Sequence, residues 1–305
     1  MDKDHSTRPY QARVEFTMRL DVRRFDPKTM KPHRTVLFVG KRGTGKSILL
    51  ADIMSHMHAR VDFGLAMTPT EESAASFRRV MPESWIYNNF NGAKLESMLA
   101  MQRELGKQNK QRSLFCVLDD CMYDKRCMKS LGIRDLFMNG RHLRCSLWFA
   151  VQYLMDLTPD LRTNVDYVFA LKENIISNKQ KLWRYFYGMF DRYEDFSRVL
   201  DRCTENYSCL VLDNTVPSSK VEECIFWYRA SVNLPPFRMG KPLFWKLAER
   251  TVKTNEDRQR DEKAEARARH AAIASRADKR ITYVTRHDAS GKPIDDDCDE
   301  ILTLN

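Results

Sequence analysis

The sequence has no apolar run long enough to cross a membrane, and its first residues lack the apolar segment of a signal peptide. It therefore predicts a chain that stays on the cytosolic side. Eight cysteines are present, but they form no C-x-x-C pair and no paired histidines follow them. A zinc site is therefore not expected, and the cysteines are predicted to be reduced thiols, several of them buried in strands.

Acidic residues are fewer than basic ones, since 41 Asp and Glu against 51 Lys and Arg give a net charge of +10. This charge favours a polyanionic partner such as nucleic acid or an acidic membrane surface, although a generally basic soluble surface would give the same number. The 305 residues are 43% hydrophobic, enough for the core of one large α/β domain or two small ones. No internal repeat is visible.

Short apolar segments alternate with segments of helical periodicity. Strands are predicted at 35–40, 61–70, 84–90, 113–121, 145–153, 166–173, 207–213 and 223–230. Helices are predicted at 46–59, 71–81, 92–111, 178–190 and 193–204. The alternation predicts an α/β fold with a mainly parallel central sheet and helices on both of its faces.

Composition divides the chain into four regions. Residues 1–32 are predicted to be an N-terminal strand or hairpin element of the core, and residues 33–232 the α/β domain. Residues 233–280 read as a linker and a charged helical extension, and residues 281–305 as an acidic, flexible tail. The charged helix is either a solvated helix or a basic arm that contacts DNA or a neighbouring subunit.

A phosphate-binding motif lies between an apolar strand and an amphipathic helix. Residues 36–50 read VLFVGKRGTGKSILL, with the spacing G-x-x-x-x-G-K-S of a P-loop, or Walker A motif. Glycines let backbone N–H groups face phosphate oxygens, Lys46 can reach the β- and γ-phosphates, and Ser47 can bind Mg²⁺. The predicted nucleotide-binding residues are Gly40, Lys41, Arg42, Gly43, Thr44, Gly45, Lys46 and Ser47.

A P-loop also needs an acidic residue on a second strand. The apolar segment LFCVLDD ends in Asp119 and Asp120. Asp119 is predicted to hold the Mg²⁺ shell through water, and Asp120 to polarise the attacking water. Asp213 also ends an apolar segment and is the rival, although it has no second acid beside it. The alternative for the pair is a solvated turn.

Three further residues are candidates for catalysis. Gln152 lies near the C-terminal end of the next apolar strand, where it could sense the γ-phosphate or orient water. The alternative is a core glutamine bonded to backbone. An arginine from a neighbouring subunit often stabilises the transferring phosphoryl group. Arg141 is the first choice for it and Arg162 the second.

The order of these motifs resembles the FtsK–HerA superfamily of P-loop ATPases, and within it the genome-packaging ATPases of large nucleocytoplasmic DNA viruses. The matching segments, spread over about residues 24–230, are FDPKTMKPHRTVLFVGKRGTGKSILLADIM, LAMTPTEES, FCVLDD, NGRHLRCSLWFAVQY and LRTNVDYVFAL. The resemblance implies a RecA/FtsK-like P-loop NTPase that hydrolyses ATP with Mg²⁺. It also implies a translocase that packages double-stranded viral DNA into a preformed capsid.

The same resemblance assigns roles and partners. It implies that Lys46 and Ser47 bind phosphate and Mg²⁺, that Asp119 is the Walker B acid and that Gln152 is the sensor. Many relatives have Asp-Glu where this chain has Asp119-Asp120, so the role of Asp120 departs from their pattern. The implied partners are a homo-oligomeric ring of five or six subunits and viral capsid or membrane-associated assembly proteins. The implied location is the viral assembly site in the host cytoplasm, with association with the virion. The chain lacks a separate nuclease domain, so it would be the motor alone.

Other functions remain open from the sequence. A small P-loop nucleoside or nucleotide kinase would share the P-loop and the parallel sheet, but no compact arginine-rich lid is found. A GTPase is disfavoured because Lys181 stands where an aspartate would bind guanine. Another DNA-handling P-loop ATPase, or a nucleotide-binding structural protein without turnover, would also fit the P-loop. Lys125, Arg126 and Lys129 could grip DNA phosphates or could be solvated loop charges.

Overall fold

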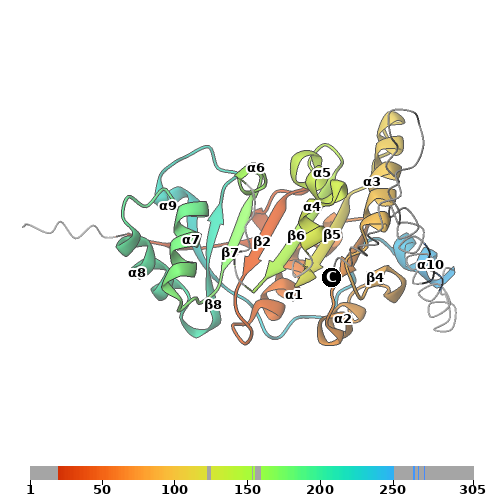
Figure 1. Ribbon diagram of the computed structural model, residues 1–305. Coiled ribbons are helices and arrows are strands. Elements are labelled where there is room, and N and C mark those ends of the chain that lie inside the picture. Colours follow the sequence, from red (N-terminus) through yellow and green to blue (C-terminus); the bar gives the residue numbers. More distant parts are fainter. Residues whose placement is uncertain are drawn as a thin grey trace, which may run out of the picture. The chain divides into compact units, whose positions relative to one another are not determined.

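The structure of the chain is a computed structural model (Figure 1). It describes residues 20–121, 125–152, 154 and 159–250, together with the single positions 264, 267 and 271. Two compact units are distinguished, residues 1–251 and residues 252–305. In the second unit the described positions, Ala264, Arg267 and Ala271, are helical.

The first unit is built on a nine-stranded sheet with the strand order β1-β9-β8-β7-β2-β6-β5-β3-β4. The strands are β1 (Arg23–Arg24), β2 (Thr35–Val39), β3 (Phe63–Met67), β4 (Ile86–Tyr87), β5 (Leu114–Asp119), β6 (Cys145–Val151), β7 (Tyr167–Ala170), β8 (Ser208–Asp213) and β9 (Ile225–Arg229). In the described part of the chain, β8 pairs antiparallel with β7 and β9, and the other pairs are parallel. The predicted mainly parallel α/β fold is therefore confirmed.

Helices cover both faces of this sheet. They are α1 (Lys46–Met57), α2 (Glu71–Arg78), α3 (Gly92–Lys107), α4 (Lys125–Lys129), α5 (Leu131–Asn139), α6 (Pro159–Arg162), α7 (Ile176–Phe186), α8 (Tyr193–Cys203), α9 (Val221–Cys224) and α10 (Pro242–Arg250). Side chains of a strand alternate between faces. In β2, Val36 and Phe38 pack with α1 and α2, whereas Leu37 and Val39 pack with α3, α5, α7 and α8. Burial on both faces explains why this strand reads as a continuous apolar run.

The parallel strands give the sheet two functionally different edges. The carboxyl ends of β2, β5, β6 and β7 meet at one edge, where ligands bind in open α/β sheets. We call this the carboxyl edge. The amino ends of the same strands meet at the opposite, amino edge. Because β8 runs against its neighbours, its start lies at the carboxyl edge and its end at the amino edge.

The segment after residue 232, expected to be a linker, packs into the first unit. The Met239 N–H donates to the carbonyl of Val80 at 2.7 Å. In α10, Phe244 is fully buried, with its ring 5.7 Å from that of Phe63 and 5.5 Å from that of Trp85. The first unit thus reaches residue 251 and does not end at 232, because α10 carries an apolar face that a composition count overlooks.

The first and the last predicted regions of the chain lie largely outside the described residues. Most of the strand expected within residues 1–32 lies outside the described residues, and β1 forms at 23–24 on the outer side of β9. The acidic tail at 281–305 also lies outside them. Among the described residues, the helices are too short or too polar to cross a membrane.

Candidate nucleotide-binding site

The P-loop lies at the carboxyl edge, directly after the central strand β2. The Gly40 N–H donates to the carbonyl of Val151 at 3.0 Å, which holds the loop against β6. A Cβ placed on Gly40 would lie 2.7 Å from both Leu171 Cδ1 and Thr44 Oγ1. Glycine is therefore required at this position by the close approach of its neighbours.

The start of α1 is open for an anion. Gly45, in the left-handed region with a φ of 90°, precedes the helix, and no side chain caps its first N–H groups. Such free N–H groups, together with the positive end of the helix dipole, form a phosphate-binding site. In the same segment Ser47 and Arg42 are exposed, and the Thr44 hydroxyl donates to the Lys41 carbonyl at 2.7 Å.

Three predicted catalytic side chains meet beside this loop. The Lys46 ammonium lies 2.6 Å from Oδ1 of Asp120, and the Gln152 amide donates to Oδ2 of the same carboxylate at 2.9 Å. Asp120 directly follows β5, and Gln152 directly follows β6. The buried ammonium of Lys46 is thus neutralised by a carboxylate that Gln152 also orients.

Asp119 is in a different environment from Asp120. It is 4% exposed, and burial raises its pKa, as does the neighbouring Asp120, whereas a hydrogen bond from Ser73 and the charge of Lys46 lower it. The net pKa lies above the ordinary value. A cation close to Asp119 would favour its ionised form.

Ser47 and Asp119 line one cavity of about 480 Å³ between α1, α2 and the segment 231–237. A hydroxyl and a buried carboxylate are hard oxygen ligands that suit Mg²⁺. In the described part of the chain, no cluster of three His, Cys, Asp or Glu side chains could hold a metal. The two residues therefore fit an ion that takes its other ligands from water and phosphate oxygens.

Glu173 is a residue of this site that the sequence reasoning missed. Its carboxylate lies 2.9 Å from the ammonium of Lys41 and accepts hydrogen bonds from the Ile175 N–H and from Asn178. Burial raises the pKa of Glu173, but Lys41 and these two donors outweigh burial and leave the pKa below its usual value. The signal was available, because Glu173 closely follows the apolar strand β7 at the carboxyl edge.

The cysteines near the site are free thiols. Cys121 directly follows Asp120, is fully buried and donates its Sγ hydrogen to the carbonyl of Met67 at 3.0 Å. Burial raises its pKa, and burial raises the pKa of Cys145 in β6 to about 12. Buried reduced thiols in strands were predicted, and Cys116, Cys145 and Cys209 confirm this among the described cysteines.

The arginine candidates do not join Lys46 within the chain. Arg141 lies at the amino edge, where its guanidinium is 2.5 Å from the buried carboxylate of Asp166. Arg162 ends α6, and its guanidinium lies 3.8 Å from the ring centre of Tyr185. A contribution from either arginine to hydrolysis would therefore be made to a neighbouring subunit and remains a prediction.

Strand direction separates Asp119 from its rival Asp213. Asp213 ends β8, and the antiparallel orientation of this strand places it at the amino edge. There its Oδ1 accepts hydrogen bonds from the N–H and the hydroxyl of Thr215 at 2.9 and 2.7 Å. Asp213 caps a turn and lies away from the P-loop.

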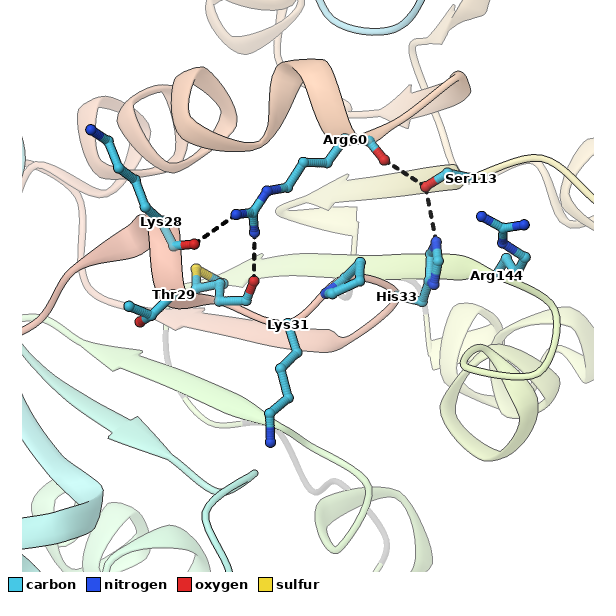
Figure 2. A pocket seen from close by; sticks show the side chains of 9 residues that line it. Lys28, Thr29, Lys31, His33, Arg60, Ser113 and Arg144 are labelled. Atoms are coloured by element: carbon cyan, nitrogen blue, oxygen red, sulfur yellow. Dashed lines mark hydrogen bonds between the residues drawn. The ribbon is translucent and has the colours of Figure 1, made fainter.

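A basic cavity of about 510 Å³ also lies at the amino edge (Figure 2). Five of its nine lining residues are basic or histidine, namely Lys28, Lys31, His33, Arg60 and Arg144. Arg60 donates to the carbonyls of Lys28 and Met30, each at 2.7 Å, and Ser113 bridges the carbonyl of Arg60 and the ring of His33. Burial and the charges of Arg144 and Arg34 lower the pKa of His33, which keeps its imidazole neutral at neutral pH.

Comparison with known proteins identifies relatives of this chain in viruses. An uncharacterized protein of Acanthamoeba polyphaga mimivirus is 32% identical over 222 residues, covering 70% of this chain and 78% of that protein. An uncharacterized protein of Frog virus 3 is 31% identical over 220 residues, covering 70% and 67%. The relatives from large DNA viruses agree with the resemblance expected from the motifs.

A solved structure shares the fold. The genome packaging NTPase B204 of Sulfolobus turreted icosahedral virus 2, in complex with AMP, matches with a TM-score of 0.51 and 16% identity. The match covers 67% of this chain and all of that one. The profile of a family described as Poxvirus A32 protein matches residues 23–225, which include the P-loop, Asp119, Asp120 and Gln152. The chain belongs to the poxvirus A32 protein family.

Proposed function

We propose that the chain is an ATP-hydrolysing motor that packages double-stranded viral DNA into a preformed capsid. One observation carries the proposal: Lys46, Asp120 and Gln152 converge beside the P-loop, next to Asp119 and Ser47. A full P-loop with two carboxylates and a polar sensor supports turnover and argues against a purely structural nucleotide site. The membership of the A32 family and the shared fold with a packaging NTPase support the viral role.

The site residues suggest how hydrolysis proceeds. The P-loop N–H groups and Lys46 bind the phosphates, while Ser47 and Asp119 would hold a Mg²⁺ ion, which would supply positive charge to offset that of the phosphates. Lys46 moves its ammonium from Asp120 to the phosphates. This frees Oδ1 of Asp120 to accept a hydrogen bond from the attacking water, while Gln152 keeps the carboxylate oriented.

The DNA would be held by basic surfaces outside the nucleotide site. The net charge of +10 and the basic cavity at the amino edge support a polyanionic partner. Lys129, at the end of α4, is exposed, and the side chains of Lys125 and Arg126 lie outside the described residues. We further propose a homo-oligomeric ring that acts with capsid or membrane-associated assembly proteins at the viral assembly site in the host cytoplasm.

The experiment that tests this function measures ATP hydrolysis with and without duplex DNA over a range of protein concentrations. We expect DNA to stimulate hydrolysis, the stimulation to weaken steeply with salt, and the rate per subunit to rise as subunits associate. The opposite result is a rate of ATP hydrolysis that does not change with DNA, while an added nucleoside or nucleotide acceptor becomes phosphorylated. That result would identify a kinase and overturn the motor.

A further inference from the structure

Tyr207 is an exposed aromatic residue beside the P-loop. Its side chain is 70% exposed, and it immediately precedes β8, whose start lies at the carboxyl edge. A Cβ placed on Gly45 would lie 3.6 Å from Cδ1 and 3.8 Å from Cβ of Tyr207. The tyrosine is therefore a direct neighbour of the loop that binds phosphate, although 162 positions separate Tyr207 from Gly45 in the sequence.

The backbone at Tyr207 is strained. Asn206 and Tyr207 have φ angles of 52° and 60°, so two consecutive residues other than glycine lie in the left-handed region. Asparagine tolerates this region, but a bulky aromatic residue is an outlier there. The exposed ring gains little from burial that could offset the strain. Backbone strain of this kind clusters at functional sites.

We propose that Tyr207 stacks its ring on the base of the nucleotide whose phosphates the P-loop holds, and that the ligand is a purine nucleoside triphosphate. A flat ring that is exposed beside the phosphate site can cover the face of a base, and purines offer the larger face. The left-handed turn serves to aim the ring along the loop. The proposal rests on the nucleotide binding proposed above and names the residue that recognises the base.

The first test compares a ligand that has a base with one that has none. Binding of ATP and of inorganic tripolyphosphate is measured by calorimetry for the wild type, Tyr207→Phe and Tyr207→Ala. We expect Tyr207→Ala to bind ATP about tenfold more weakly, in the range of one stacking contact, and Tyr207→Phe to bind it nearly as well as the wild type. Tripolyphosphate should bind all three proteins equally.

The second test uses the strain. Glycine adopts the left-handed region freely, so Tyr207→Gly should raise the melting temperature while it weakens ATP binding. Asn109, with a φ of 55°, is an exposed left-handed residue after α3, ahead of β5 and thus at the amino edge. Asn109→Gly is the matched control and should leave ATP affinity unchanged.

The outcomes separate this proposal from the proposed function. If the wild type binds ATP and Tyr207→Ala binds it equally well, or loses ATP and tripolyphosphate binding alike, the stacking role is overturned and the motor stands. A lower melting temperature of Tyr207→Gly would show that the ring stabilises the fold, and would also overturn it. If the wild type neither binds nor hydrolyses ATP, both proposals fail.

Discussion

The buried ammonium of Lys46 has two alternative counter-charges, the Asp120 carboxylate and a bound phosphate. With Lys46 and Asp120 at 2.6 Å, the pair is satisfied before any nucleotide is present. Breaking a buried pair costs free energy unless a new partner replaces the old one. A triphosphate is such a partner, so binding and the release of Asp120 are coupled at the scale of one residue.

Lys46→Ala should abolish ATP hydrolysis, because it removes the cation that holds the β- and γ-phosphates. We expect a loss of about 100-fold or more, the size typical for one preorganised charge at a transition state. Steady-state release of phosphate measures it. Lys107→Ala, at the exposed end of α3, is the control and should keep full activity. Unchanged turnover in Lys46→Ala would rule out the P-loop assignment.

Asp119→Asn should separate stability from activity. Because the folded-state pKa of Asp119 is raised, its contribution to stability is fully present below its unfolded pKa and is lost as pH rises through the folded value. At neutral pH without nucleotide, Asp119→Asn should therefore melt at a higher temperature than the wild type, yet hydrolyse no ATP. Melting curves from acid to neutral pH test this, and a gap that closes toward acid pH is the expected signature. A variant that melts lower at neutral pH would contradict it.

At the scale of elements, strand direction decides which polar residues meet. The sequence identified Asp119, Asp120 and Gln152 because each closes an apolar strand, and parallel strands bring such ends together. The same rule could not exclude Asp213, since nothing in the segment YSCLVLD indicates that β8 is antiparallel to its neighbours. Pairing partners are set by packing across the whole sheet, which one strand's sequence does not contain.

Contacts between segments that are distant in the sequence were the other feature that could not be predicted. Glu173 meets Lys41, and Tyr207 lies beside Gly45, through proximity that only the folded sheet creates. The helix α10 lies within residues 233–280, which composition predicted to be a linker and a charged helical extension. The role of its apolar residue Phe244 becomes visible only from its contacts with the rings of Phe63 and Trp85, which belong to distant segments.

Phe244→Ala tests whether α10 is an integral part of the first unit. Because Phe244 is fully buried, we expect a loss of about 3–5 kcal/mol in the free energy of unfolding, measured by denaturant titration. Leu243→Ala is the matched control on the same helix, since Leu243 is 51% exposed and should cost little. Equal, small losses for both variants would return this segment to the status of a linker.

At the scale of the whole molecule, the two sheet edges divide the work that we propose. The carboxyl edge gathers Lys46, Asp119 and Gln152, whereas Arg141 and the basic cavity lie at the amino edge. A subunit with Lys46 and Asp120 at one edge and Arg141 at the other could contribute its arginine to the site of a neighbouring subunit. Such an arrangement is compatible with a ring of subunits joined head to tail that share active sites.

Mixing variants tests this arrangement. Arg141→Ala alone should lose activity, and adding the inactive Lys46→Ala should restore part of it, because mixed interfaces join an intact Lys46 with an intact Arg141. Asp166→Asn removes the charge that holds Arg141 within its own chain but keeps the guanidinium, so it should remain active. Absence of rescue, together with an inactive Asp166→Asn, would leave Arg141 as a structural residue.

The buried thiol of Cys121 can report when the protein opens beside the nucleotide site. Its Sγ is bonded to the Met67 carbonyl and closed to solvent, one position after Asp120. An alkylating reagent can reach it only when the segment around Cys121 opens to solvent, so the labelling rate of this cysteine follows that opening. Peptide mass spectrometry of the labelled protein thereby records, without any introduced cysteine, how often the segment that directly follows Asp119 and Asp120 opens.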